Sequence, residues 1–222
     1  GLSFLVRRSK GARGFGKFSR KFAKAEKCTL ILGWRLGIIV FIDDYLNIFT
    51  ISASLRETCD KYKSPREMLA YVIDSTGAPV CVLIPLSTWA VFYAGVVGGE
   101  AGMVIYGSGM DIYIQSLPFI LYGWVAVIVV PLVIFRIIPM FGPMKKAYER
   151  VATTGRVYSE QSDKYNKGIT EFDKLMESEK MDDDGKKGNI WFFLVPLAVV
   201  IFLCIYTGDL LTGLAFGIIV ML

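Results

Sequence analysis

The chain has 222 residues, of which 54% are hydrophobic and 20% charged, with a formal net charge of +5. With several long apolar stretches, this composition is typical of a polytopic membrane protein. Histidine is absent, which removes the commonest general base and metal ligand and every Ser/His/Asp or Cys/His nucleophilic arrangement. The four cysteines are scattered without paired spacing, so we expect reduced packing residues rather than a zinc or redox site.

The distribution of Lys and Arg predicts the topology. Basic residues crowd residues 1–27, recur over 56–68 and return in 140–188, whereas 98–116 contains neither Lys nor Arg. Short loops rich in Lys and Arg stay in the cytoplasm, so these three basic ranges are predicted to be cytoplasmic and 98–116 external. The expected location is the cytoplasmic (inner) membrane, and residues 1–27 are expected to face anionic lipid rather than nucleic acid.

The first apolar stretch, 28–55, has basic residues on both flanks. If it crossed the membrane, one flank would lie outside against the positive-inside tendency, so we expect a re-entrant helical hairpin with Asp43 and Asp44 near its tip. A carboxylate at the bilayer centre costs roughly 3 kcal/mol, so two adjacent ones indicate a cation site.

Polar residues continue from the tip along one predicted helix face. Asp43, Asn47, Thr50 and Ser54 follow the spacing i, i+4, i+7, i+11, which places them on the same side of a helix. Thr50 and Ser54 fit equally well as residues that hydrogen-bond to neighbouring helices. Arg35 is the nearby intramembrane base available to the aspartates.

The second apolar stretch, 69–97, contains a predicted break. Proline lacks an amide donor, glycine costs about 1 kcal/mol within a helix, and Ser and Thr offer the backbone alternative bonds. These residue types follow Asp74 consecutively as Ser75, Thr76, Gly77, Ala78 and Pro79. We expect a non-helical stretch over 75–79 whose half-helix ends hold Na⁺, with a simple proline kink and a structurally paired Asp74 as the alternative.

The remaining chain is divided by composition. Residues 117–139 are predicted to form a membrane helix, and 140–188 a polar cytoplasmic loop with one or two helices. Asp182, Asp183 and Asp184 lack EF-hand spacing and are expected to lie in a solvated linker. Residues 189–222 are predicted to hold further membrane helices, cut off within a span, so we expect about half of a longer transporter.

Several segments together resemble the NhaC-type sodium/proton antiporter family. They are Gly33–Asn47, Asp60–Lys61, Ser64–Tyr71, Asp74–Cys81 and the start of the polar loop at Gly142–Ala147. The resemblance implies an all-α polytopic protein built from inverted repeats, each with one hairpin and one broken helix. Gly77, where the family pattern has Ala, and Pro65, where it has an aliphatic residue, depart from that pattern.

The combined interpretation is a secondary transporter that exchanges Na⁺ for protons, with no enzymatic activity and no cofactor. The expected ion- and proton-binding residues are Asp43, Asp44, Asn47, Asp74, Ser75 and Thr76, with Asp44 and Asp74 as Na⁺ ligands and Thr50, Arg35 and Pro79 as secondary candidates. Expected partners are membrane lipids, Na⁺, H⁺ and the other half of the protein; a homodimer stays open. Exchange of small carboxylates or amino acids is the alternative cargo, and a non-transporting membrane scaffold the alternative class.

Overall fold

The structure is a computed structural model of the chain, and it describes residues 24–160, 162 and 191–207 with single positions at 212, 215, 216 and 219. The regular elements within these ranges are all helical, which confirms the all-α class. Predictions for most of 1–27, for 163–190 and for most of 208–222 lie outside the described residues. The helices are α3 (Glu26–Ile39), α4 (Asp44–Lys61), α5 (Arg66–Leu83), α6 (Thr88–Gly98), η1 (Ala101–Tyr106), α7 (Gly109–Ser116), η2 (Leu117–Phe119), α8 (Leu121–Ile134), α9 (Gly142–Thr154) and α11 (Trp191–Thr207).

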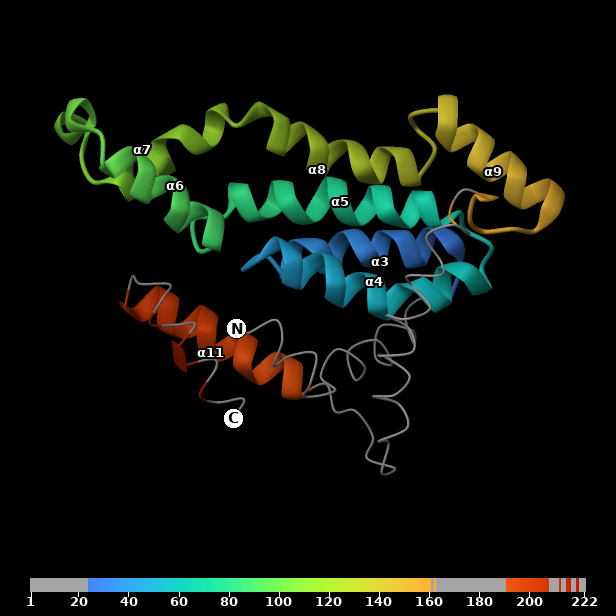
Figure 1. Cartoon of the computed structure of the whole chain (residues 1–222), viewed down its shortest axis with the longest axis horizontal. Coiled ribbons are helices and arrows are strands. Elements are labelled where there is room, and N and C mark those ends of the chain that lie inside the picture. The colour runs from blue at the N-terminus through green and yellow to red at the C-terminus, as the bar shows by residue number, and fades with distance from the viewer. Residues whose placement is uncertain are drawn as a thin grey trace.

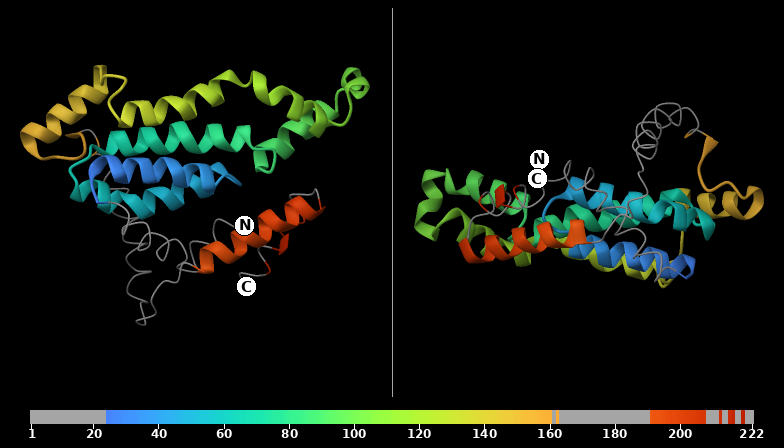
Figure 2. Two further views of the ribbon diagram at one scale, coloured as in Figure 1. Left: turned by 180° about the vertical axis from the view of Figure 1, so that it is seen from behind. Right: turned by 90° about the horizontal axis from the view of Figure 1, so that it is seen from below.

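Helix α5 is the centre of the arrangement. In Figure 1 it lies between α8 on one side and the α3 and α4 pair on the other, and the view from behind in Figure 2 shows the same order. Helices α6 and α7 extend from one end of this group and α9 covers the other, while α11 lies below α6 and to the lower left of α4 in Figure 1.

Helices α3 and α4 form an antiparallel pair joined by a short link at 40–43. Apolar side chains on their inner faces, including Leu30, Leu36, Ile51 and Leu55, are buried in one hydrophobic core with Met68 and Val72 of α5. Both outer ends of the pair lie at the α9 end of the molecule. The pair extends to Lys61, six residues beyond the predicted boundary at Leu55.

Two helix pairs are bent. Helices α5 and α6 meet at 47°, and the run Gly109–Phe119 meets α8 at 49°. Within the described residues, no single helix has both the length and the hydropathy to cross a bilayer, whereas each bent pair together has both. The bent pairs lie side by side because α5 packs on α8 and α6 packs on α7.

The predicted break at 75–79 is wrong, since α5 is continuous from Arg66 to Leu83 and includes Pro79. The break lies at residues 84–87. Pro85 has no amide to donate to the carbonyl oxygen of Cys81, and the Oγ of Ser87 donates to that oxygen instead. Ser87 also accepts the amide of Ala90 at 3.1 Å and so caps the start of α6.

Proline also shapes α8. Pro131 lies inside the helix and cannot donate to the carbonyl oxygen of Val127. The indole Nε1 of Trp34 donates to that oxygen at 3.0 Å and so connects α3 to α8. A bond that proline removes from one helix thereby becomes a bond between helices.

The predicted external loop at 98–116 is largely helical, because it contains η1 and α7. Helix α7 packs closely on α6: a Cβ atom at Gly109 would lie 1.9 Å from the carbonyl oxygen of Ala94. The predicted helix over 117–139 is shorter, since α8 ends at Ile134.

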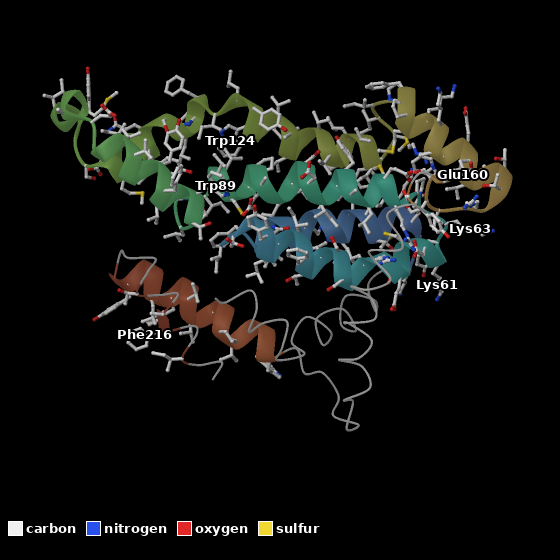
Figure 3. All side chains as sticks on the ribbon, in the orientation of Figure 1. Lys61, Lys63, Trp89, Trp124, Glu160 and Phe216 are labelled. Carbon is white, nitrogen blue, oxygen red and sulfur yellow. The ribbon has the colours of Figure 1, made fainter. Side chains whose placement is uncertain are left out.

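Polar and apolar ends are separated. Figure 3 shows Lys61, Lys63 and Glu160 at the α9 end, and Trp89 and Trp124 toward the α6 and α7 end. At the α9 end, Arg66 pairs with Asp60 at 2.8 Å, and its guanidinium lies 4.9 Å from the ring centre of Tyr158. Helix α9 falls within the predicted polar loop and is amphipathic, with Ala147 and Val151 buried.

Candidate functional site

The link between α3 and α4 meets the break between α5 and α6. The amide of Thr88 donates to the carbonyl oxygen of Ile42 at 2.9 Å, which joins the two non-helical segments directly. Helices α4 and α6 both begin here, and α3 and α5 both end here. Helix amino ends carry partial positive charge and carboxyl ends partial negative charge, so this junction gathers ends that attract both anions and cations.

Asp43 and Asp44 lie at this junction, both partly buried. Asp43 is the N-cap of α4, because its Oδ1 accepts the amide of Leu46 at 2.9 Å. Asp44 is the first residue of the helix, and its Oδ1 accepts the amide of Tyr45 at 3.0 Å. Both carboxylates lie within electrostatic range of the Cys81 thiol near the end of α5. Asp43 thus caps α4 at the tip. The Oδ2 of Asp44 accepts no hydrogen bond among the described contacts.

Asn47 lies one turn below the tip and is fully buried. Its Nδ2 donates to the carbonyl oxygens of Gly37 and Val40, at 2.7 and 2.9 Å, and so binds the last carbonyls of α3. Its Oδ1 is buried without a hydrogen-bond partner in the described part of the chain. A buried amide oxygen without a partner costs about 1–3 kcal/mol, so its retention calls for an explanation.

Thr76 is the second buried residue of this kind. Its side chain is fully buried and its Oγ1 has no partner among the described residues. Glycines bring these groups together: a Cβ atom at Gly37 would lie 2.8 Å from Cγ2 of Thr76, and one at Gly77 would lie 3.0 Å from Oδ1 of Asn47. The three helices α3, α4 and α5 therefore meet around two unpaired, uncharged oxygens.

Asp74 and Ser75 lie on a different face of α5. Asp74 is exposed, and both residues line an open groove of about 580 Å³ between α4 and α5. Ile48 and Ser52 form the α4 wall of the groove. The structure thus brings Asn47 and Thr76 together inside the helix group but places Asp74 and Ser75 outside it.

A line of residues on α4 and α5 nevertheless runs between Asp44 and Asp74. On α4, Asp44, Ile48 and Ser52 are spaced by four residues, so Asp44 lies one turn beyond the groove toward the tip. On α5, Cys81, whose thiol interacts electrostatically with Asp44, follows Asp74 by seven residues, about 10 Å at ~1.5 Å per residue. Asp44 and Asp74 occupy two separate positions along this line, and no hydrogen bond or ion pair joins them within the described residues.

The secondary candidates lie in varied positions. Arg35 is exposed on α3 and, within the described chain, makes no ion pair with either aspartate of the tip. Thr50 is buried, and its carbonyl oxygen accepts a hydrogen bond from the Oγ of Ser54 at 2.6 Å, a bond within α4 rather than the expected bond to a neighbouring helix. Pro79 is buried within the continuous part of α5.

A metal cluster of the acidic type is not formed by the described residues, where no three His, Cys, Asp or Glu side chains gather. A cation at the tip would therefore be held by one or two carboxylates together with carbonyl, amide or hydroxyl oxygens. Hard cations such as Na⁺ accept such ligands in the broken helices of transporters.

At the α9 end, Tyr148 connects three elements. Its hydroxyl donates to Oε1 of Glu26 on α3, and the guanidinium of Arg136 lies 4.5 Å from its ring centre. Burial raises the pKa of Tyr148 above its ordinary value, and the hydrogen bond to Glu26 raises it further. The tyrosine therefore stays neutral and holds α9 against α3.

Sequence reasoning missed Pro85 and Ser87, which make the break. A proline two residues before a serine that can cap a helix is a stop followed by a start, and that signal was present in the sequence. The indole bond from Trp34 to Val127 had no comparable signal, because it depends on how α3 packs against α8.

Comparison with known proteins gives one limited similarity. The chain is 34% identical over 98 residues to an uncharacterized protein of Haemophilus influenzae, and this match covers 44% of the chain and 19% of that protein. The chain thus matches about a fifth of that relative's length. No protein-family model and no solved structure matches the chain.

Proposed function

We propose that this chain forms the ion-binding part of a membrane transporter that exchanges Na⁺ for protons, as its resemblance to NhaC-type antiporters implies. In this proposal the α3 and α4 pair is a re-entrant hairpin, and α5 with α6 is a broken membrane helix of one inverted repeat. The bent pairs have the length and hydropathy for spans. The placement of both hairpin ends beside the charged α9 end agrees with a hairpin that enters and leaves on one side.

The observation that carries the proposal is the pair of buried oxygens without partners, Oδ1 of Asn47 and Oγ1 of Thr76, close to the acidic tip. A protein interior keeps such groups where a ligand or ordered water completes them. Na⁺ would complete them as a cation that accepts neutral oxygens, with Asp44 supplying the balancing charge.

Proton exchange would follow from competition. A carboxylate in a poorly solvated place binds a proton more readily, and a nearby Na⁺ favours the ionised form. The proposal places this competition at Asp44, which is partly buried at the junction, and at Asp74, which lines the groove between α4 and α5. Asp43, as the N-cap of α4, would keep the tip in shape.

The test is transport by the natural full-length protein in proteoliposomes that contain a pH-sensitive dye. Adding Na⁺ outside should move protons, and Asp44→Asn and Asp74→Asn should each abolish this movement. Glu149→Gln is the matched control, because Glu149 is an exposed acid in a long 3.9 Å pair with Lys145. Activity in both Asn variants, or proton movement that responds to malate, lactate or an amino acid but not to Na⁺, would overturn the proposal.

A further inference from the structure

The groove between α4 and α5 has an orientation. Glu67, Tyr71 and Asp74 recur at i, i+4 and i+7 along its α5 wall, from the α9 end toward the tip. Ser52 and then Ile48 face them from α4, and Asp44 follows one turn later. Polar groups therefore recur along the groove from the charged end of the molecule, and the apolar Ile48 separates Ser52 from Asp44 at the junction of the two breaks.

Pro79 also changes the backbone bonding of Ser75, a residue that lines the groove. Pro79 has no amide, so the carbonyl oxygen of Ser75 lacks its usual helical donor. At Pro85 the corresponding carbonyl accepts a hydrogen bond from the Ser87 hydroxyl, and at Pro131 it accepts one from the Trp34 indole. Among the described residues no side chain does this for Ser75. The Ser75 carbonyl, which lacks the donor four residues on, belongs to the residue that directly follows Asp74.

The mouth of the groove is held by α9. Arg150 donates to Oε2 of Glu67 at 2.9 Å, and both side chains are partly exposed. Arg150 also donates to the carbonyl oxygen of Arg156 at 3.2 Å, which fixes its direction. The hydrogen bond from Arg150 therefore fixes the Glu67 carboxylate at the entrance of the groove, where the polar loop meets the helices.

From this arrangement we propose that the groove is a water-filled path by which cations reach the tip from the cytoplasmic end. In this proposal Glu67 lies at the entrance of the path, and Asp74 with the Ser75 carbonyl forms an intermediate cation-binding position before Asp44. The inference rests on the proposed function, because an exposed Asp74 is costly only at membrane depth, where a carboxylate needs water or a bound cation. A protein segment packed into the groove would leave Asp74 and the Ser75 carbonyl without water.

Cysteine labelling tests the path without requiring transport. Ser52→Cys and Ser75→Cys are placed singly in a cysteine-free form of the natural full-length protein, in inside-out membrane vesicles. A membrane-impermeant cationic thiosulfonate reagent should label both positions, and about tenfold faster than an anionic reagent of similar size, because the exposed carboxylate of Asp74 attracts cations whereas Glu67 is paired with Arg150. Excess Na⁺ should slow labelling at Ser75 more than the same concentration of choline.

Ile128→Cys is the matched control. Gly123 packs against Leu83 and sets the register of α8 on α5, so Ile128 lies near the level of Ala78 but on an exposed apolar face. It should stay unlabelled in lipid. Absence of labelling at both groove positions, equal labelling at Ile128, or labelling only from the outside would overturn the path. Labelling as expected without Na⁺-driven proton movement would keep the path and remove the Na⁺/H⁺ assignment, so the two failures are distinguishable.

Discussion

The amide of Thr88 donates to the carbonyl oxygen of Ile42, and this 2.9 Å bond joins the tip of the α3 and α4 pair to the first turn of α6. Neither group has an intrahelical partner of its own, because Thr88 is at the start of a helix and Ile42 lies in the link. The two interruptions therefore satisfy each other. A movement of α6 would therefore shift the α3–α4 link through this contact, and with it any ion bound at the tip.

This relationship predicts the effect of Pro85→Ala. The substitution returns an amide to position 85 that can donate to the carbonyl oxygen of Cys81, so α5 should extend toward α6 and the 47° bend should decrease. Spin labels at Ala70 and Val96, both exposed, should move apart in pulsed electron resonance measurements. Pro79→Ala is the control and should leave the label distance unchanged, since α5 already continues through Pro79. Equal changes in the two variants would argue against Pro85 as the cause of the bend.

Much of the helical framework could be predicted from the sequence. The apolar stretches and the acidic pair correctly indicated helices separated by a short link at Asp43. The position of the second break could not be found by counting unfavourable residues. Ser75, Thr76 and Gly77 tolerate helical geometry where a neighbouring helix packs closely. The single proline of this segment, Pro79, does not interrupt α5. Packing of Asn47 against Gly77 decided that segment.

The candidate site was predicted in composition but not in arrangement. The sequence placed Asp74, Ser75 and Thr76 in one motif, but consecutive helical residues point about 100° apart. Thr76 therefore faces the buried junction, while Asp74 and Ser75 line the groove. Membership of a motif could not say which residue faces which helix, because that depends on the packing of α3 and α4 on α5.

Close packing at the junction predicts a steric effect of Gly37→Ala. The new methyl group would lie 2.8 Å from Cγ2 of Thr76, so the variant should lose about 1–3 kcal/mol of stability by overpacking. Adding Thr76→Ser removes that methyl group and should recover part of the loss. Thermal unfolding in detergent, followed by size-exclusion fluorescence, measures both. If the double variant is no more stable than Gly37→Ala, the contact with Thr76 is not the source of the strain.

The Tyr148 contact predicts a pH dependence. Because the folded-state pKa lies above the ordinary value of 10.0, the stabilisation is complete below about pH 10 and is lost as the pH rises toward the folded-state pKa. Tyr148→Phe removes the bond to Glu26 and should lower stability by about 1 kcal/mol at pH 8. Unfolding curves at pH 8 and 11 should show the gap between the two proteins narrowing at the higher pH. A gap that is constant over this range would mean that ionisation of Tyr148 does not weaken the docking of α9.

The bond from Trp34 to Val127 predicts coupling between a tryptophan and a proline on different helices. Trp34→Phe keeps an aromatic ring but leaves the carbonyl oxygen of Val127 without a donor, which should cost about 1–3 kcal/mol. Pro131→Ala supplies an amide that can donate to the same oxygen within α8. In the Pro131→Ala background, Trp34→Phe should therefore cost much less, and a double-mutant cycle of unfolding free energies should show a favourable interaction. Trp124→Phe is the control, because its indole donates to the carbonyl oxygen of Leu117 and should add independently to Pro131→Ala. Simple additivity for Trp34 as well would show that its indole does not replace the amide that Pro131 lacks.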